Sequence, residues 1–502
     1  MSKVWTPRPQ DQVPLIEFGA SRDKWLLLAP PGAGKTAIAA SWAANLMYEE
    51  LCLPRLLIVA PPMVARDAWP AVGQWQHLER FASDMRVLTA EDFDLRPRAM
   101  VIGDEDAWEC MLGCLDEPTK AFCEVNRLGL DFWDMPRTRR RLLGYTERIH
   151  VCPKPFFPWL ERCLGLRMPY QGVIYDESSG LRDPSSDQTK SMRRFVHSTV
   201  KKTKVDYVCL LTGTPNANHG PAIYPQAHLV APGLLAKNLT DFRTRWCQPD
   251  TVNRQTGDVY SWKIVPALQD ELARKIASVG VSVPSTLSTP LVELEIAVAT
   301  PPDALAAYRR MEDQSVWASA SAANPGVRHS KLRQMAAGFV YEDNDKVLFL
   351  DNSRIERIVE DETEYGGQIV LAFNFQEEAD RLRKAFGDRV KDIRQTGAKE
   401  AFTSGRLPYL MLHPASAGHG VDGLQHACNQ LWWVSLTDDL ELYQQTNARV
   451  HRHGTQAQTV YVRRYFAPGT IEEQIKDVVL PGKASLADLI LRGTRVGSTV
   501  QV

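Results

Sequence analysis

Short apolar runs, each followed by polar residues, glycine or proline, are the feature that most restricts how this chain can fold. The first half contains such runs at Leu26–Ala29, Leu56–Ala60, Val173–Asp176 and Val208–Thr212. Continuous apolar runs of this kind are typical of parallel strands that are buried on both faces of a sheet. Amphipathic segments such as Thr36–Glu50 separate them, so strands and helices alternate. We therefore expect an α/β fold with ligand-binding residues after the carboxyl ends of the strands.

The second half repeats this pattern. Strands are expected at Gln368–Ala372, Leu410–His413, Leu431–Val434 and, from a weaker pattern, Val460–Val462. The stretch between the halves is less regular and contains several prolines, which indicates a connecting region with some helices of its own. The sequence thus predicts two α/β lobes, with the first at 1–240, a connecting region at 241–325, the second lobe at 326–482 and a C-terminal tail at 483–502.

Composition excludes several other classes of protein. The chain has 502 residues, of which 44% are hydrophobic and 24% charged, as in ordinary folded proteins and unlike disordered, collagen-like or coiled-coil chains. Lys plus Arg is 59 and Asp plus Glu is 60, so the net charge is −1. This balance excludes a uniformly basic nucleic-acid binder, but not an enzyme that confines its basic groups to one groove.

The location expected from the sequence is the cytoplasm. No apolar run approaches the roughly 18 residues needed to cross a bilayer, so we expect no membrane partner. The polar, proline-rich N-terminus is unlike a signal peptide, and nine scattered cysteines favour reduced thiols. A zinc site is not expected, because the spacings fit no common ligand pattern among Cys110, Cys114, Cys123, His150 and Cys152.

A phosphate-binding loop is predicted directly after the first apolar run. The segment Ala29–Thr36 matches the Walker A pattern, except that Ala29 replaces the first glycine. Gly32 and Gly34 would let backbone N–H groups turn toward phosphate oxygens, and the helix that follows would add its positive N-terminal dipole. Lys35 would contact the β- and γ-phosphates, and the Thr36 hydroxyl would bind Mg²⁺. Pro31 and Ala33 complete the predicted loop.

An acidic pair ends the third apolar run. Asp176 would hold Mg²⁺, and Glu177 would orient and deprotonate the attacking water. Such a pair alone is a weak signal, because strand ends at the surface often carry carboxylates. Its position downstream of a phosphate loop makes a nucleotide hydrolysis site the better interpretation.

The acidic pair belongs to a set of segments that resembles the motifs of Swi/Snf-type ATPases, in helicase superfamily two. Motif Ia is similar to Leu57–Pro61 with Val64–Arg66 and Trp69–Pro70. Motif II is similar to Asp176–Ser179 with Leu181 and Pro184–Ser186. Motif III is similar to Thr212–Pro215 with Asn218. In the second half, His413–Gly420 resembles motif V and Leu442–Arg452 resembles motif VI. The motifs follow the family order over most of the chain, and the compact layout resembles helicases encoded by bacteriophages.

The resemblance implies two RecA-like lobes with an ATP cleft between them. Catalytic roles are implied for Lys35, Glu177 and the motif VI arginines Arg449 and Arg452, which we expect on one helical face. Gln12 competes with Gln10 for an adenine-reading role and is favoured because Ile16 lies four residues further on. The full set implied to bind nucleotide is Gln12, Pro31, Gly32, Ala33, Gly34, Lys35, Thr36, Asp176, Gly420 and Gln445.

Coupling and DNA contact are also implied by the resemblance. Thr212, Gly213 and Thr214 would couple the nucleotide state to lobe movement, and Ser416 would contact the nucleic-acid backbone. Motif V departs from the family at Val421–Gln425, which is one residue longer than the usual continuation, so the role of this segment in DNA contact is open.

Two basic stretches are further candidates for DNA contact. Residues 92–148 resemble an insertion relative to compact relatives, and this segment contains Arg139, Arg140 and Arg141 near aromatic residues. Lys190, Arg193 and Arg194 follow motif II in a stretch without acidic residues. For both stretches the alternative is a solvated helix face.

Taken together, the sequence predicts a DNA-dependent ATPase that uses ATP and Mg²⁺ to translocate on, or remodel, duplex or branched DNA. One alternative is a helicase that separates DNA or RNA strands. Another is a module in which ATP controls binding to nucleic acid or to a protein. Other replication or recombination proteins are possible partners, and a bacterial or phage-infected cytoplasm is the expected setting.

Overall fold

The computed structural model of the protein describes most of the chain. The described residues are 3–8, 12–30, 32–93, 95–96, 131–132, 135–198, 204–215, 220–252, 259–283, 287–314, 316–317, 320–321, 325–342, 346–417 and 423–495. They form two compact units, one of Met1–Thr286 with Leu486–Val502 and one of Leu287–Ser485. The segment 241–325, expected as a connecting region, is therefore divided between the two units.

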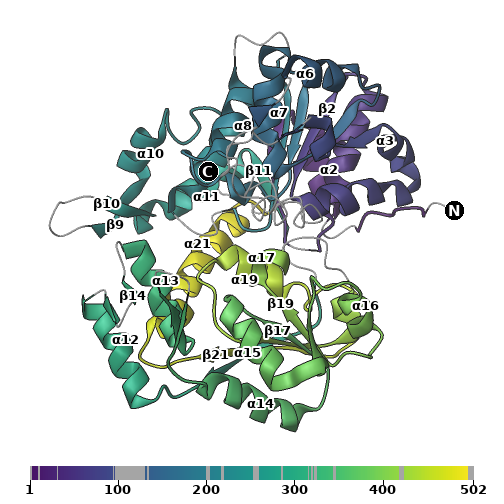
Figure 1. The fold of residues 1–502 in the computed structure, drawn as a ribbon. Helices are drawn as coiled ribbons and strands as arrows, with labels where there is room; N and C mark the ends of the chain where they lie inside the picture. The colour runs from purple at the N-terminus through teal and green to yellow at the C-terminus, as the bar shows by residue number, and fades with distance from the viewer. Residues whose placement is uncertain are drawn as a thin grey trace. The chain divides into compact units, whose positions relative to one another are not determined.

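The first unit is built on a parallel sheet of seven strands (Figure 1). The order across the sheet is β11-β1-β8-β7-β2-β6-β3, and every pairing is parallel. The bounds are β1 Lys24–Leu28, β2 Leu56–Ala60, β3 Met85–Val87, β6 Ile149–Pro153, β7 Gly172–Tyr175, β8 Tyr207–Thr212 and β11 Gly280–Ser282. All four strands predicted in the first half are present, and they lie side by side as β1, β8, β7 and β2.

Three strands of this sheet were not predicted. β6 contains His150, a polar residue that interrupts the apolar pattern although its side chain is fully buried. β3 and β11 are each only three residues long, and β11 comes from the expected connecting region. Short or polar strands lack a signal of their own, and the neighbouring strands supply their hydrogen bonds.

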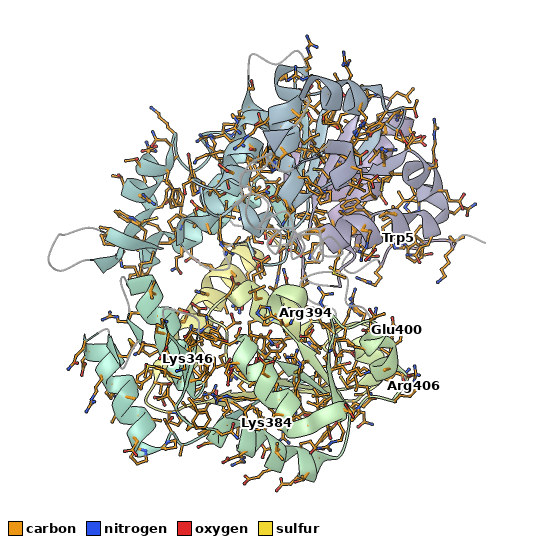
Figure 2. The ribbon with its side chains drawn as sticks, viewed as in Figure 1. Trp5, Lys346, Lys384, Arg394, Glu400 and Arg406 are labelled. Atoms are coloured by element: carbon orange, nitrogen blue, oxygen red, sulfur yellow. The ribbon has the colours of Figure 1, made fainter. Side chains whose placement is uncertain are left out.

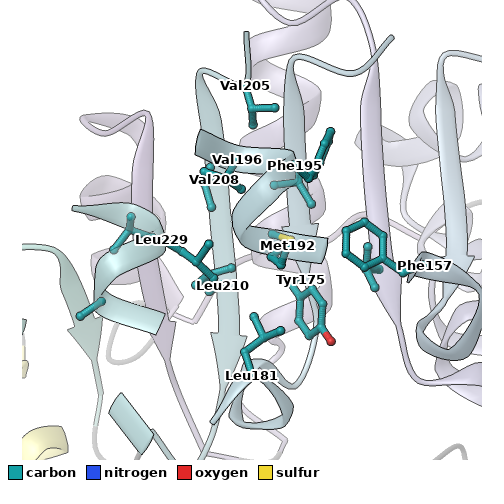
Figure 3. Close-up of a cluster of buried hydrophobic side chains, with 14 of the residues drawn as sticks. Phe157, Tyr175, Leu181, Met192, Phe195, Val196, Val205, Val208, Leu210 and Leu229 are labelled. Atoms are coloured by element: carbon teal, nitrogen blue, oxygen red, sulfur yellow. The ribbon is translucent and has the colours of Figure 1, made fainter. Parts of the chain in front are cut away.

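Helices cover both faces of this sheet because side chains alternate along each strand. Trp25 and Leu27 of β1 pack with α1 Gln12–Ala20 and α2 Lys35–Ala44, whereas Leu26 and Leu28 face a second cluster. Figure 3 shows part of that cluster, where Tyr175 and Leu210 meet Met192. The helices on that face are α7 Phe157–Leu164, α8 Asp187–His197, α9 Ile223–Val230 and α11 Gln269–Ala277.

In the described part of the chain, the first unit also contains three further α-helices and two antiparallel strand pairs. They are α3 Glu79–Ser83, α6 Met135–Gly144, α10 Leu239–Trp246, the antiparallel pair β9 Cys247–Val252 and β10 Val259–Ile264, and the antiparallel pair β4 Leu95–Arg96 and β5 Asp131–Phe132. The C-terminal residues also join this unit. Ile490 of α21 Leu480–Gly493 lies in its core, and the Ser282 N–H donates to the Thr494 carbonyl (2.9 Å). The described part of the expected tail, up to Arg495, thus contributes to a folded unit.

The second unit contains a parallel sheet of six strands in the order β12-β21-β20-β17-β19-β18. The bounds are β12 Leu291–Ala297, β17 Ile369–Ala372, β18 Val390–Asp392, β19 Tyr409–Leu412, β20 Gln430–Trp433 and β21 Val460–Phe466. The four strands predicted in this half are present, including the weakest. Two strands of this sheet were missed. The exposed and half-buried side chains of β12 alternate without an apolar run, and β18 is only three residues long.

The helices of the second unit are mostly short. They are α12 Pro302–Gln314, α13 Pro325–Ala336, α14 Ser353–Tyr365, α15 Gln376–Phe386, α16 Ala398–Thr403, α17 Pro414–Ala417, α18 Leu424–Ala427, α19 Leu440–Asn447, α20 Ile471–Gln474 and the start of α21. Two antiparallel pairs accompany them, β13 Val316–Trp317 with β14 Ala320–Ser321 and β15 Phe339–Tyr341 with β16 Val347–Phe349. Figure 2 shows charged side chains of both signs on this unit, among them the exposed Lys384, Glu400 and Arg406.

The two parallel α/β sheets confirm the predicted fold class. The ATP cleft expected between two RecA-like lobes remains a prediction. Among the residues described, no helix combines the length and apolar character needed to cross a membrane.

A buried ion pair holds the second unit together. Arg354 of α14 makes two hydrogen bonds to the Glu472 carboxylate of α20 (2.7 and 2.5 Å), and the two side chains are 6% and 1% exposed. The guanidinium also donates to the carbonyls of Val434 (3.0 Å) and Ala336 (2.6 Å). Every charge in this pair is therefore met by hydrogen bonds, which is what a buried ion pair requires.

Removing one partner of this pair should strongly destabilise the second unit. We expect Arg354→Met to lower its free energy of unfolding by about 3–5 kcal/mol, because Glu472 would stay buried without its counter-charge. Urea unfolding followed by tryptophan fluorescence measures this. The control is Arg309→Met, which breaks a largely exposed pair with Glu312 and should change stability by less than about 1 kcal/mol. Equal effects of the two substitutions would contradict the prediction.

The buried His150 should make the first unit sensitive to acid. Its Nδ1 lies 2.6 Å from the Tyr170 hydroxyl, and burial lowers the pKa of the imidazole to about 4. An unfolded histidine titrates near 6.5, so the unfolded chain gains a proton first as the pH falls. The stabilisation is complete above pH 6.5, and about 3 kcal/mol of it is lost between pH 6.5 and 4.

Urea unfolding at several pH values tests this pH dependence. The matched variant is His150→Phe combined with Tyr170→Phe, which removes the titrating group together with the hydroxyl that would lose its partner. We expect the double variant to lose less stability than the wild type over this interval. If both lose the same amount, another group is responsible.

Candidate functional site

The predicted phosphate loop connects β1 to α2. Gly32 and Gly34 have φ angles of 82° and 86°, a region that glycine adopts without strain. The Ala33 N–H donates to the Pro30 carbonyl (3.2 Å), and the Ala29 N–H donates to the Thr212 carbonyl at the end of β8 (3.0 Å). Left-handed positions of this kind turn successive N–H groups toward one point, as an anion-binding loop requires. Pro31 lies outside the described residues.

Lys35 is the first residue of α2 and reaches back over the loop. Its Nζ donates to the carbonyls of Ala29 (2.8 Å) and Pro30 (3.4 Å). Thr36 follows it in the first turn of the helix and is half-buried. A lysine bonded to two neutral carbonyls can exchange them for charged phosphate oxygens, because charge-assisted hydrogen bonds are stronger.

Gln12, the favoured adenine reader, lies against this loop. Its Nε2 donates to the Ala33 carbonyl (3.1 Å), and its Oε1 accepts from the Arg8 N–H (3.0 Å). The Arg8 guanidinium also donates to Ala33 (3.3 Å). Gln12 is 4% exposed, so in this structure its amide supports the loop backbone. The adenine-reading role stays a prediction, and Gln10 lies outside the described residues.

The acidic pair follows β7, two strands from β1 in the same sheet. The Asp176 carboxylate is buried and accepts hydrogen bonds from the Trp69 indole N–H (3.1 Å) and the Glu177 N–H (3.0 Å). Glu177 has φ 50° and ψ 63°, a left-handed conformation that is strained for a residue with a side chain. The strained residue, Glu177, is thus the one that the sequence predicts to be the general base.

The electrostatics of Asp176 favour a cation beside it. Burial raises the pKa of its carboxyl to about 6, and the Glu177 carboxylate acts in the same direction. The ammonium groups of Lys35 and Lys154 oppose this shift, as does the Trp69 hydrogen bond. A buried carboxylate whose charge is only partly compensated is a suitable ligand for a hard divalent cation such as Mg²⁺.

The segment predicted to couple nucleotide state to movement follows β8. Thr212 and Thr214 are buried, and the Thr214 N–H donates to the Thr212 hydroxyl (3.0 Å). Gly213 lies between them. The fully buried Gln226 of α9 accepts from the Ser178 hydroxyl (2.8 Å) and donates to the Pro215 carbonyl (3.0 Å). It therefore bridges the loops that follow the acidic pair and the Thr-Gly-Thr segment.

The motif VI arginines belong to the second unit, and their local structure differs from the expectation. α19 ends at Asn447, so Arg449 and Arg452 lie in the turns after the helix and share no helical face. The turn is held by the Thr455 hydroxyl, which donates to the Arg452 carbonyl (2.7 Å). After Asn447 the backbone hydrogen bonds tighten to the i→i−3 pattern of turns, with the Arg449 N–H donating to the Thr446 carbonyl (3.1 Å) and the Val450 N–H to the Asn447 carbonyl (3.2 Å). The Asn447 side chain accepts a hydrogen bond from the Trp433 indole (2.9 Å).

The other nucleotide and DNA candidates of the second unit are placed as follows. Gln445 is buried on α19 and donates to Glu441 (3.1 Å). Ser416 lies in α17, and Gly420 lies outside the described residues. Roles in nucleotide and DNA contact therefore stay predictions for all three.

Three of the six basic candidates in the first unit have partners within that unit. Arg139 donates to the Cys163 carbonyl and Arg141 to the Glu91 carbonyl, both at 2.5 Å. The Arg194 guanidinium donates to the Glu161 carboxylate (2.7 Å), which is buried. These arginines hold helices and loops in place, so they are less suited to DNA contact than the sequence suggested.

The other three basic candidates differ from one another in exposure. Arg140 on α6 and Arg193 on α8 are exposed, and Lys190 on α8 is half-buried. Exposure is the property that a phosphate contact requires, so Arg140 and Arg193 are the better candidates.

Sequence reasoning missed two residues of this site. Lys154 follows β6 and donates to the Glu177 carbonyl (2.7 Å), and Gln226 forms the bridge described above. The position of Lys154 at the site was not predicted, because the strand before it, β6, was not predicted. For Gln226 the only signal was a polar residue within the apolar stretch Ile223–Val230.

Comparisons with known proteins give limited similarity. No family model matches the chain. Protein p41 of the Acyrthosiphon pisum secondary endosymbiont phage 1 is 25% identical over 513 residues, covering 98% of this chain and 99% of p41. Among solved structures, the Sulfolobus solfataricus SWI2/SNF2 ATPase core in complex with double-stranded DNA is 16% identical, with a TM-score of 0.37 and coverage of 98% of this chain and 96% of that one. At that TM-score the likeness supports neither a shared fold nor a shared function.

The close approach at Gly34 gives a test of the loop. A Cβ built there would lie 2.5 Å from Gln12 Nε2, and the φ of +86° disfavours any side chain. We expect Gly34→Ala to weaken binding of a fluorescent ATP analogue at least about tenfold, since the loop must shift away from its anion-binding geometry. Gly144→Ala is the control, because nothing lies within 4 Å of its added Cβ. Unchanged affinity in Gly34→Ala would argue against phosphate binding by this loop.

Proposed function

We propose that this protein is a DNA-stimulated ATP hydrolase of the Swi/Snf-like type, which couples turnover to translocation on, or remodelling of, duplex or branched DNA. The observation that carries the proposal is the convergence at one sheet edge of the phosphate loop after β1 and the acidic pair after β7, with Lys35 acting electrostatically on Asp176. The order of the sequence motifs supports the family, and similarity to a phage protein supports a phage origin.

ATP would be held by the loop and the start of α2. The N–H groups around Gly32, Ala33 and Gly34 would bind the β- and γ-phosphates, and Lys35 would leave its loop carbonyls to join them. Asp176 and Thr36 would hold Mg²⁺, directly or through water, and the partly compensated charge of Asp176 fits that role. Bound there, Mg²⁺ would neutralise charge on the phosphate oxygens.

Glu177 would act as the general base. It would accept a proton from a water molecule whose oxygen attacks the γ-phosphorus, and the bond from that phosphorus to the bridging oxygen of ADP would break. The resemblance assigns Arg449 and Arg452 to the charge that develops on the γ-phosphate, where arginine suits several oxygens at once. Their place after α19, in turns, does not conflict with this role.

DNA contact would involve Arg140 and Arg193, whose side chains are exposed on the first unit, together with the motif V segment that contains Ser416. A net charge of −1 is compatible with a motor, because a motor must release DNA in every cycle. Other replication or recombination proteins would be partners in this function.

Rates of ATP hydrolysis test the proposal directly. We expect turnover that requires Mg²⁺, is abolished by Lys35→Ala, and rises at least about tenfold with duplex or branched DNA. The measurement compares phosphate release with no nucleic acid, single-stranded DNA, duplex DNA, branched DNA and RNA. Equal rates in all five conditions would contradict DNA dependence.

The two alternatives give different results with Glu177→Gln and with a strand-displacement assay. Glu177→Gln should bind ATP normally and lose turnover by about 10²-fold or more. A module that only binds under ATP control would keep its biological activity in this variant, whereas a motor would lose it. Displacement of a triplex strand without separation of the duplex would favour translocation over a strand-separating helicase.

A further inference from the structure

A lysine that the proposed mechanism does not use lies beside the acidic pair. Lys154 is the first residue after β6, and its Nζ donates a hydrogen bond to the Glu177 carbonyl (2.7 Å). The same ammonium lies 5.1 Å from the centroid of the Tyr175 ring, the last residue of β7. The lysine is half-buried, so these contacts are made in an environment where charge is only partly screened.

The backbone of Glu177 is held on both sides. Its N–H donates to the Asp176 carboxylate (3.0 Å), and its carbonyl accepts from Lys154 and from the Gly180 N–H (3.2 Å). Glu177 is one of two described non-glycine residues with positive φ, the other being Leu51. A strained conformation persists only where the surroundings enforce it, and the Lys154 ammonium is the charged donor among the groups that do so.

Lys154 is itself held in place. Its carbonyl accepts a hydrogen bond from the Gln188 amide, and the Gln188 Oε1 accepts from the Tyr175 hydroxyl (3.3 Å). The positive charge of Lys154 also favours ionised Asp176, as does that of Lys35. The lysine therefore links the loops after β6 and β7 at the carboxyl edge of the sheet.

We propose that Lys154 is a positioning residue for ATP hydrolysis, which holds Glu177 in the left-handed conformation that aims its carboxylate at the attacking water. The inference rests on the proposed function. It assigns Lys154 no contact with ATP or Mg²⁺, so its effect on the rate should pass through Glu177. A small displacement of a catalytic group lowers a rate by up to about 10²-fold, which sets the size of the expected effect.

The test uses the full-length chain and the variant Lys154→Met, which keeps the apolar stem over Tyr175 but removes the ammonium. We expect kcat to fall about 10- to 100-fold, while the affinity for a fluorescent ATP analogue changes by less than about threefold. The midpoint of thermal unfolding should be unchanged within about 2 °C. Lys237→Met, at an exposed lysine of the same unit, is the matched control and should behave as the wild type.

A double-mutant cycle distinguishes positioning from a merely structural role. In the Glu177→Gln background, Lys154→Met should lower single-turnover hydrolysis by less than about threefold, because its target is already absent. Full additivity of the two substitutions would overturn the proposal. Lys154→Arg keeps a cationic donor and should recover most of the lost kcat, so a Lys154→Arg variant as slow as Lys154→Met would also overturn it.

The remaining outcomes separate this inference from the proposed function. A wild-type protein without ATPase activity under any condition would contradict the proposed function itself. An active wild type together with an unaffected Lys154→Met variant would overturn only the role of Lys154. A large loss of nucleotide affinity in Lys154→Met would replace positioning by direct phosphate contact, which also overturns it.

Discussion

The burial of the Asp176 carboxylate is the constraint around which the first unit is arranged. A carboxylate removed from water needs hydrogen-bond donors and positive charge, or it takes up a proton. Trp69 supplies a donor from the segment after β2, Glu177 supplies its own N–H, and Lys35 and Lys154 supply charge from the loops after β1 and β6. Groups that follow four strands, β1, β2, β6 and β7, therefore stabilise this one carboxylate.

Hydrogen bonds connect the residues beside Asp176 to the loops after β6 and β8. Glu177 is held in a strained conformation between Asp176 and Lys154, and Ser178 is joined through Gln226 to Pro215 after β8. A shift of the acidic loop would then break hydrogen bonds of a fully buried amide, which is unfavourable. In the proposed function, this connection is a physical route by which the loop after β8 would respond to a nucleotide bound after β1 and β7.

Much of the fold could be predicted because parallel strands buried on both faces leave an unmistakable apolar run. The eight predicted strands are present, whereas β3, β6, β11, β12 and β18 were missed because they carry polar residues, are short or lie exposed at an edge. The phosphate loop and the acidic pair were predicted from local residue types, and their roles in binding nucleotide and Mg²⁺ stay predictions. Lys154 was not, because its position is meaningful only once β6 is known to lie beside β2.

The sequence by itself determined the local chemistry, since glycines, a lysine, a threonine and two carboxylates placed directly after apolar runs define what each loop can bind. Tertiary structure decided which polar groups work together. Within the folded chain, three arginines form hydrogen bonds with other residues of the first unit, namely Arg139, Arg141 and Arg194. The helix α19 ends before Arg449, and Lys154 lies within hydrogen-bond distance of the Glu177 carbonyl. The physical reason is that hydrogen bonding and burial depend on strand order and helix ends, and these follow from packing between segments far apart in the chain.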